Sequence, residues 1–372
     1  MSTAEIVEVW NGPGRRDGVL TPVQPQHNGL HPSPSKLAFE HWYFDAHLDT
    51  GHVVIGFLTK RRPEDLPYAK PWVEMIVYAP DGTRRQVSRR YPRAAAVFSA
   101  GTCDVRIGAN RAHTEHPADG LPIHHLHMAE DGIVFDLRFH NETPSWMPGK
   151  GETRFGSRDS FGWMVGAPRA RVTGAIELDG TRHEVTGRGY HDHNWGVGDM
   201  KKIIDRWHWG RLYVEDYSLL YASVLTQQRQ GGHEISPLML AHHADIVLST
   251  GETILTEGPA RFDAVAGRAY PEWIELRVPE SVDLRLVVDK VIHAHDLIDD
   301  IPVARSRLIK PLVHRLVGHP GYFRFESSFE LTVHTATGVE KRTGSTLHEL
   351  VALARPGPPS FRRGNPPIAV SI

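Results

Sequence analysis

Short runs of alternating apolar and polar residues, separated by turn signals, recur along most of the chain. Residues 40–48 are followed by Asp49-Thr50-Gly51 and then by residues 52–58, a pattern that predicts a β-hairpin. Further tight turns are marked by Asp-Gly pairs at residues 81–82, 119–120, 131–132 and 179–180. Many short strands without long helical periodicity predict an all-β protein made of antiparallel barrels or sandwiches.

The strand expected at residues 40–48 has no plainly apolar face. Side chains alternate between the two faces of an extended strand. One face would carry Glu40, Trp42, Phe44 and Ala46, and the other His41, Tyr43, Asp45 and His47. Both sets mix polar and apolar side chains, which is unusual for a half-buried strand. A binding cavity on one side would explain the mixture.

Two segments depart from the β pattern. Residues 1–36 are rich in Pro, Gly, His and Asn, which predicts an irregular N-terminal arm. Residues 301–317 carry leucines spaced four apart, which predicts a short helical segment in the C-terminal half. Pro311 lies inside this segment, so we expect a kink or two short helices there.

Length and composition limit the remaining possibilities. The chain has 372 residues, 40% of them hydrophobic, which suits two domains; we place them at residues 37–215 and 216–372. The net charge of −2 gives no basic footprint, so nucleic acid is not an expected partner. Cys103 is the single cysteine, which excludes an internal disulfide. Residues 1–16 lack the apolar core of a signal peptide, and we expect a cytoplasmic protein.

The most unusual stretch is YHDHNWG at residues 190–196. It places two imidazoles, a carboxylate, an amide, a phenol and an indole in seven positions, and residues 207–210 (WHWG) follow closely. Burying Asp and Asn costs free energy unless they find partners. The stretch is therefore either a hydrogen-bonded strand junction or the floor of a site.

These motifs resemble a known superfamily. The combination of EHWYFDA (residues 40–46), GYHDHNWG (189–196) and the following Trp207-x-Trp209-Gly210 is similar to the carotenoid 1,2-hydratase (hydroxyneurosporene synthase)-like proteins. That superfamily also includes the lipocalin-like AttH proteins, kievitone hydratase-like proteins and decalin-forming Diels–Alderases. The resemblance implies two lipocalin-like (calycin) antiparallel β-barrel domains with a site between or within them.

A hydratase of this kind must protonate an unactivated alkene, and water then captures the carbocation. A carboxyl group can do this only if burial keeps it protonated at the working pH. Asp192 is the expected acid of a cofactor-independent hydratase or dehydratase acting on an isoprenoid or other apolar substrate. The other expected catalytic residues are His191, Tyr190, His193 and Glu40. The expected substrate-binding residues are Trp42, Tyr43, Asp45, Asn194, Trp195 and Trp209. A cationic His191 or His193 would lower the pKa of Asp192, so either both histidines are neutral or the acid is elsewhere, with Glu40 and Asp45 as the next choices.

Several alternatives stay open at this stage. A pericyclic cyclase would need only to fold a polyene and donate hydrogen bonds to it. A carrier of apolar ligands would need the aromatic pocket without a positioned acid. A metal would need His191 and His193 with a third ligand from His208, from residues 124–127 or from a distant carboxylate, although we expect no metal.

Simpler interpretations apply to several motifs as well. Asp192 and Asn194 would then only cap a bulge or bridge the two barrels. The histidines at residues 124–127 are expected at the surface or on an edge strand. Residues 301–317 would meet an anionic membrane through their basic face, or pack on a barrel with that face solvated. The sequence does not indicate an oligomeric state.

Overall fold

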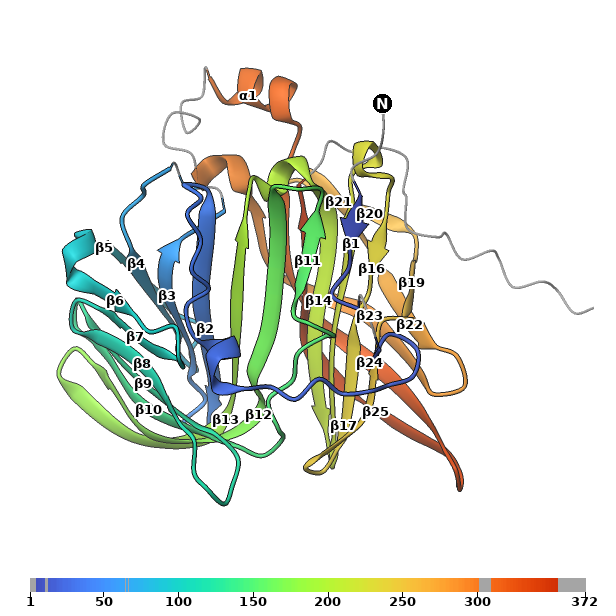
Figure 1. Cartoon of the computed structure of the whole chain (residues 1–372), viewed down its shortest axis with the longest axis horizontal. Coiled ribbons are helices and arrows are strands. Elements are labelled where there is room, and N and C mark those ends of the chain that lie inside the picture. Colours follow the sequence, from blue (N-terminus) through green and yellow to red (C-terminus); the bar gives the residue numbers. More distant parts are fainter. Residues whose placement is uncertain (1–4, 11–12, 64, 66, 301–308, 354–372) are drawn as a thin grey trace, which may run out of the picture.

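The computed structural model describes residues 5–10, 13–63, 65, 67–300 and 309–353. Two large antiparallel β-sheets lie side by side and curl around separate interiors (Figure 1). The residues described include a single α-helix, α1 (Lys310–Val317), in the C-terminal half. The predicted all-β class, with lipocalin-like antiparallel domains and a short C-terminal helical segment, is confirmed.

The first sheet contains thirteen strands. Its main path runs β5-β4-β3-β2-β13-β12-β10-β9-β8-β7-β6, with β11 paired to β12 and β1 to β11. The strands are β1 (Ile6–Val7), β2 (Ala38–Leu48), β3 (Val53–Arg61), β4 (Trp72–Tyr78), β5 (Arg84–Arg90), β6 (Ala96–Phe98), β7 (Asp104–Ile107), β8 (Asn110–Glu115), β9 (Ile123–Glu130), β10 (Ile133–Asn141), β11 (Glu152–Phe155), β12 (Asp159–Leu178) and β13 (Thr181–Val197). The expected hairpin is confirmed as β2 and β3.

The second sheet runs β18-β17-β15-β14-β25-β24-β23-β22-β19, with β16 paired to β15 and a separate ribbon of β20 and β21. Its strands are β14 (Ile204–Val214), β15 (Tyr217–Thr226), β16 (Glu234–Ile235), β17 (Leu238–His242), β18 (Asp245–Thr250), β19 (Ile254–Glu257), β22 (Trp273–Val278), β23 (Val282–Asp296), β24 (Gly321–Thr335) and β25 (Gly338–Ala352). The ribbon strands are β20 (Ala260–Asp263) and β21 (Arg268–Pro271). Five 3-10 helices are also described: η1 (Pro25–Asn28), η2 (Arg93–Ala95), η3 (Met200–Lys202), η4 (Gln228–Gln230) and η5 (Leu297–Asp300). The chain thus passes from the first sheet to the second between Val197 and Ile204. The division into domains at residue 215 stays a prediction.

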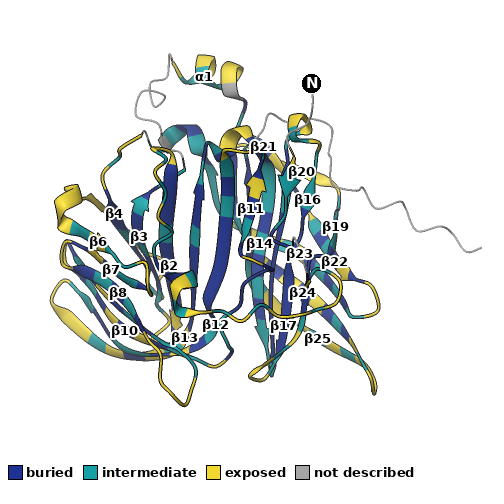
Figure 2. Cartoon of the chain, in the orientation of Figure 1, coloured by how far each residue is buried: buried dark blue, intermediate teal, exposed yellow. Residues whose placement is uncertain are grey.

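Each sheet encloses its own apolar core, and a third cluster joins the two sheets. In the first core, Trp42 and Phe44 of β2 are fully buried. The joining cluster consists of Trp146, Trp163, Val165 and Tyr190 from the first half of the chain and Leu220, Ala222, Met239 and Ala241 from the second, with Tyr43 and Trp209 packed against it. We call this contact the seam. Figure 2 shows buried residues concentrated on β2, β12 and β13 in the middle of the molecule.

The N-terminal arm runs across both sheets (Figure 1). It begins with β1 beside β11. Arg15 then forms an ion pair with Glu252 of the second half of the chain. Further along the arm, at η1, the indole of Trp42 donates a hydrogen bond to the carbonyl of Asn28. The arm therefore reaches the middle of the first sheet through hydrogen bonds rather than through strand pairing.

The helix α1 begins at Lys310, and Pro311 lies in its first turn, where its missing N–H costs nothing. The expected kink at Pro311 is therefore not found, and residues 301–308 lie outside the described part of the chain. Leu312 and Leu316 are 57% and 65% exposed. Within the described ranges, helices are too short or too polar to cross a bilayer.

Candidate active site

Strand alternation divides the predicted site residues between two faces. On β2 and β13, directly opposed residues share a face. Tyr43 lies opposite Asp192, and Asp45 lies opposite Tyr190. These four side chains belong to what we call the seam face, with His41 and Asn194. The intervening residues form the inner face, toward the first core: Glu40, Trp42, Phe44, His191, His193 and Trp195.

Asp192 is the central polar group of the seam face. One carboxylate oxygen, Oδ2, accepts hydrogen bonds from the Tyr190 hydroxyl at 2.9 Å and from the Trp163 indole at 3.0 Å. The other oxygen, Oδ1, accepts from the Asn194 amide at 3.1 Å. The side chain is 7% exposed. All three partners are neutral, so Asp192 has no opposite charge bonded to it.

This environment favours the protonated form of Asp192. Burial raises the pKa of the carboxyl to about 7, and the negative charge of Asp45 adds to the rise. Hydrogen bonds from Trp163 and Tyr190 act in the opposite direction. His191 and His193 point away to the inner face, so neither contacts the acid that we expected them to orient. The predicted acid therefore keeps its proton to a higher pH than an ordinary aspartic acid does.

A buried ion pair lies beside Asp192 on the seam face. Arg211 of β14 reaches across the seam, and its Nη2 lies 2.5 Å from Oδ1 of Asp45. The Tyr43 hydroxyl donates to Oδ2 of the same carboxylate at 2.7 Å. Burial would raise the pKa of Asp45, but the charge of Arg211 and its hydrogen bond hold it below the usual range. The guanidinium also lies over the Tyr190 ring, 4.4 Å from its centroid.

The inner face is closed by the N-terminal arm. Nδ1 of His191 donates to the carbonyl of Tyr43 at 2.9 Å, and its Nε2 accepts from the Asn28 amide at 2.9 Å. A neutral imidazole can make both hydrogen bonds, because one ring nitrogen donates and the other accepts. Burial lowers the pKa of His191 well below its usual value. Trp42 stacks on the His193 ring at 4.4 Å between centroids. This face is a packed interior in which every polar group of His191 has a partner.

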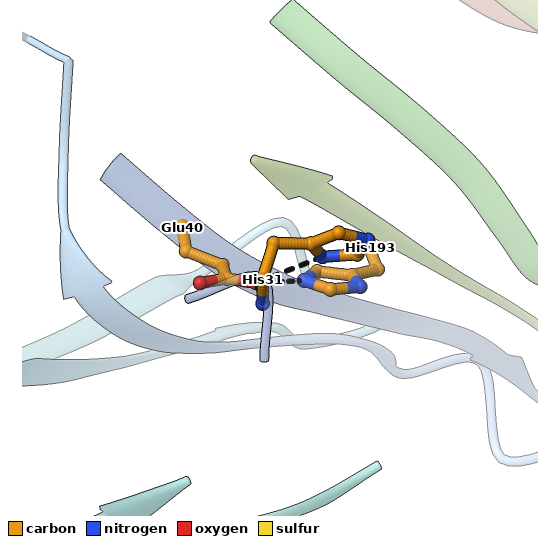
Figure 3. A group of neighbouring side chains, drawn as sticks. All are labelled: His31, Glu40 and His193. Carbon is orange, nitrogen blue, oxygen red and sulfur yellow. Dashed lines mark hydrogen bonds and ion pairs between the residues drawn. The ribbon is translucent and has the colours of Figure 1, made fainter. Parts of the chain in front are cut away.

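Two imidazoles, those of His31 and His193, lie beside one oxygen of Glu40, as Figure 3 shows. His193 Nε2 lies 3.0 Å from Glu40 Oε1, and His31 Nδ1 lies 3.2 Å from the same atom. Burial would raise the pKa of Glu40, but the hydrogen bonds from His193 and His31 overcome it and lower that pKa to about 2. Lys60 lies 3.8 Å from the second oxygen. Glu40, the second candidate acid, is thus ionised in the working range of pH.

The metal hypothesis required His191 and His193 in one ligand set. Within the described residues, His193 joins a converging set of ligand atoms with His31 and Glu40, and two further sets lie elsewhere (His113, Glu115 and His125; Asp216, His242 and His243), but His191 belongs to none of them. Imidazole and carboxylate are donors that Zn²⁺ accepts. In this structure, however, both imidazoles already bind the Glu40 carboxylate, and His193 also lies 3.3 Å from the carbonyl of His27.

Several important residues escaped sequence reasoning. Trp163 and Arg211 contact the predicted acid and its neighbour, yet they stand on β12 and β14 at a distance in sequence. His31 and Asn28 come from the arm, which we expected to be irregular. His124 was expected at the surface and is instead buried, with Nε2 donating to the carbonyl of Gly166 at 3.1 Å. A signal for Arg211 existed in its i+2 spacing from Trp209.

Comparisons with known proteins agree with this architecture. The model of the AttH-like family matches residues 21–298, and the chain belongs to that family. The resemblance drawn from the motifs is confirmed. A hydroxyneurosporene dehydrogenase from Chlorobaculum tepidum is 34% identical over 86 residues, which is 22% of this chain and 22% of that protein. The chain therefore spans less than a quarter of that relative in the match.

Solved structures show the same fold over almost the whole chain. CghA has a TM-score of 0.61 at 15% identity, covering 91% of this chain and 94% of CghA. A candidate AttH from Nitrosomonas europaea gives 0.57 at 14% identity, covering 89% and 97%. Kievitone hydratase from Nectria haematococca gives 0.53 at 16% identity, covering 89% and 91%. At these identities the likeness is one of fold.

Proposed function

We propose that this protein is an enzyme that protonates a C=C bond at the seam, as a hydratase or dehydratase of an isoprenoid or other apolar substrate. The observation that carries the proposal is Asp192, a buried carboxyl bonded only to neutral donors and placed where aromatic side chains of both sheets meet. Two similar proteins carry enzyme names, kievitone hydratase and hydroxyneurosporene dehydrogenase, and the first of these names a hydration reaction.

The chemistry balances with Asp192 alone. The protonated carboxyl gives its proton to one alkene carbon, the π electron pair forms the new C–H bond, and the other carbon becomes a cation. The faces of Tyr43 and Trp209 are suited to stabilise that cation. Water attacks it through oxygen, and the Asp192 carboxylate then takes the proton that the oxonium loses. Dehydration is the same sequence in reverse, and no cofactor is required.

Deuterium uptake tests the proposal without knowledge of the natural substrate. Farnesol, an acyclic isoprenoid with trisubstituted alkenes, would be incubated with the protein in D₂O and analysed for carbon-bound deuterium. We expect uptake with the wild-type protein and with Asp136→Asn, an exposed carboxylate on β10, and its loss in Asp192→Asn. Equal uptake in the two variants would remove Asp192 from the mechanism.

The runner-up is a pericyclic cyclase, and the buried donors of the seam favour it as the second candidate. Such an enzyme would convert a linear polyene into an isomer of unchanged mass. It would take up no carbon-bound deuterium and would keep most of its rate in Asp192→Asn. A carrier would bind the polyene and return it unchanged.

A further inference from the structure

Two buried hydrogen-bond donors at the seam have no acceptor among the residues that the structure describes. They are Nη1 of Arg211 and Nε1 of Trp209. Both residues stand on β14, two positions apart, so both side chains leave the same face of the strand. Opposite them on β15 lie Leu220 and Ala222, which belong to the apolar seam cluster. The two donors therefore stand beside the apolar seam cluster.

The two carboxylates of β2 and β13 on the seam face already accept hydrogen bonds. Both oxygens of Asp45 accept hydrogen bonds, from Arg211 Nη2 and from Tyr43. Both oxygens of Asp192 accept as well, from Tyr190, Trp163 and Asn194. Folded proteins rarely leave buried N–H groups unpaired, because each would lose its hydration without compensation. An acceptor from outside the chain is the missing partner.

Position links this acceptor to the acid. The Arg211 guanidinium lies 4.4 Å from the centroid of the Tyr190 ring and 5.6 Å from that of Trp209. The Tyr190 ring contacts the Trp209 ring at 5.5 Å, and its hydroxyl binds Asp192. A ligand oxygen held by these two donors would thus be separated from the Asp192 carboxyl, the proposed acid, by the Tyr190 ring.

We propose that the seam recognises a carbonyl oxygen of the substrate through Arg211 Nη1 and Trp209 Nε1. The substrate class is then an oxygenated isoprenoid or polyene, such as a ketone, rather than a pure hydrocarbon. A carbonyl oxygen accepts two hydrogen bonds and donates none, which suits two donors beside acceptors that are already occupied. A carboxylate would add negative charge next to Asp45, whose charge Arg211 already balances. This inference rests on the proposed function for its setting, and it concerns binding alone.

A matched pair of ligands tests it. Geranylacetone would be compared with the hydrocarbon that has CH₂ in place of its carbonyl, by titration calorimetry. The common background is Asp192→Asn, so that no turnover interferes. Adding Trp209→Phe removes one N–H and keeps an aromatic ring. We expect affinity for geranylacetone to fall about five- to tenfold, as for loss of one neutral hydrogen bond, and affinity for the hydrocarbon to stay unchanged.

The control is Trp273→Phe on β22, which is separated from β14 by three strands of the second sheet and should change neither affinity. The double variant Asp45→Asn with Arg211→Met removes the other donor without leaving a buried carboxylate unpaired, and should weaken geranylacetone alone. Equal weakening of both ligands by Trp209→Phe would reduce the contact to packing and overturn the proposal. No change for either ligand would overturn it too, since water would then be the partner. Failure of deuterium uptake in the wild-type protein would sink the acid mechanism but leave this ligand difference intact.

Discussion

The two faces of the β2–β13 pair carry alternating residues of the same two strands, but their surroundings differ. On the inner face, His191 and His193 hold the N-terminal arm, and Trp42 is fully buried among aromatic rings. On the seam face, Tyr190 and Asp192 meet side chains of the second sheet. Neighbouring residues of β13 lie on opposite faces, because side chains alternate along a strand. His191 therefore packs against the arm, whereas the next residue, Asp192, is the proposed acid.

The same contrast separates two buried carboxyls. Glu40 on the inner face has a pKa lowered to about 2, and Asp192 on the seam face has a pKa raised to about 7. Both are buried, so burial alone does not decide the direction. Glu40 has Lys60 and two imidazoles beside it, whereas Asp192 has neutral donors and the nearby anion of Asp45. The charge of the partners decides which carboxyl can act as an acid.

The largest expected effect is a loss of activity caused by a change on the seam face. Asp192→Asn should lower kcat by about 10²–10⁴-fold, the usual contribution of positioned proton transfer. The fold should remain, since Asn keeps an oxygen for Trp163 and Tyr190. Steady-state rates and far-ultraviolet circular dichroism would show whether activity is lost without unfolding. The inner-face change His191→Asn should leave kcat within a few-fold, and an equally inactive His191 variant would undo the division into faces.

The next largest effect is a loss of stability caused by a change on the inner face. Trp42→Ala deletes a fully buried indole and its hydrogen bond to Asn28, so the free energy of unfolding should fall by about 3–5 kcal/mol. Urea unfolding would measure it. Tyr43→Ala, at the neighbouring half-buried position, should cost less stability and more activity. The reverse ranking would contradict the assignment of the two faces.

Stability should depend on pH with opposite slopes at the two carboxyls. The pKa of Asp192 is raised from 3.8 to about 7, so the folded state holds its proton more tightly, and stability should fall by about 4 kcal/mol as the pH rises from about 4 to 7. The pKa of Glu40 is lowered from 4.5 to about 2, so its contribution of about 3 kcal/mol is present above pH 4.5 and is lost as the pH falls toward 2. Unfolding curves of Asp192→Asn and Glu40→Gln across pH should each lack one slope; unchanged curves would refute these environments.

The smallest effect sharpens the seam face. Trp163→Phe removes one donor to the ionised carboxylate, so the pKa of Asp192 should rise by about one unit or less. An acid is active in its protonated form, so the alkaline limb of the pH–rate profile should move to higher pH. The control Trp146→Phe removes an indole that donates to Ser249 instead, and should leave that limb in place. A shift to lower pH in Trp163→Phe would contradict the assigned direction.

The sequence predicted local features well and distant partners poorly. Turn signals and alternation placed the β2–β3 hairpin, and the density of YHDHNWG marked the central strand. Alternation alone could not show which face of β2 meets the first core, because Asp45 and Glu40 both find partners from remote segments. Arg211 and Trp163 became visible only when β14 and β12 were placed beside β13. The burial of His124 could not be predicted, because its hydrogen-bond partners, Thr114 and Gly166, are not adjacent to it in the chain.

The pairing of β2 with β13 also sets the order in which the protein can assemble during synthesis. β2 can form a hairpin with β3 at once, but its other neighbour is complete only when the ribosome has reached Val197. Such non-local contacts slow folding, because a long loop must close before they form. The nascent chain must then still add β14 to supply Arg211. The central strand β13 is therefore the last strand of the first sheet to be made, and until then β2 exposes an unpaired edge.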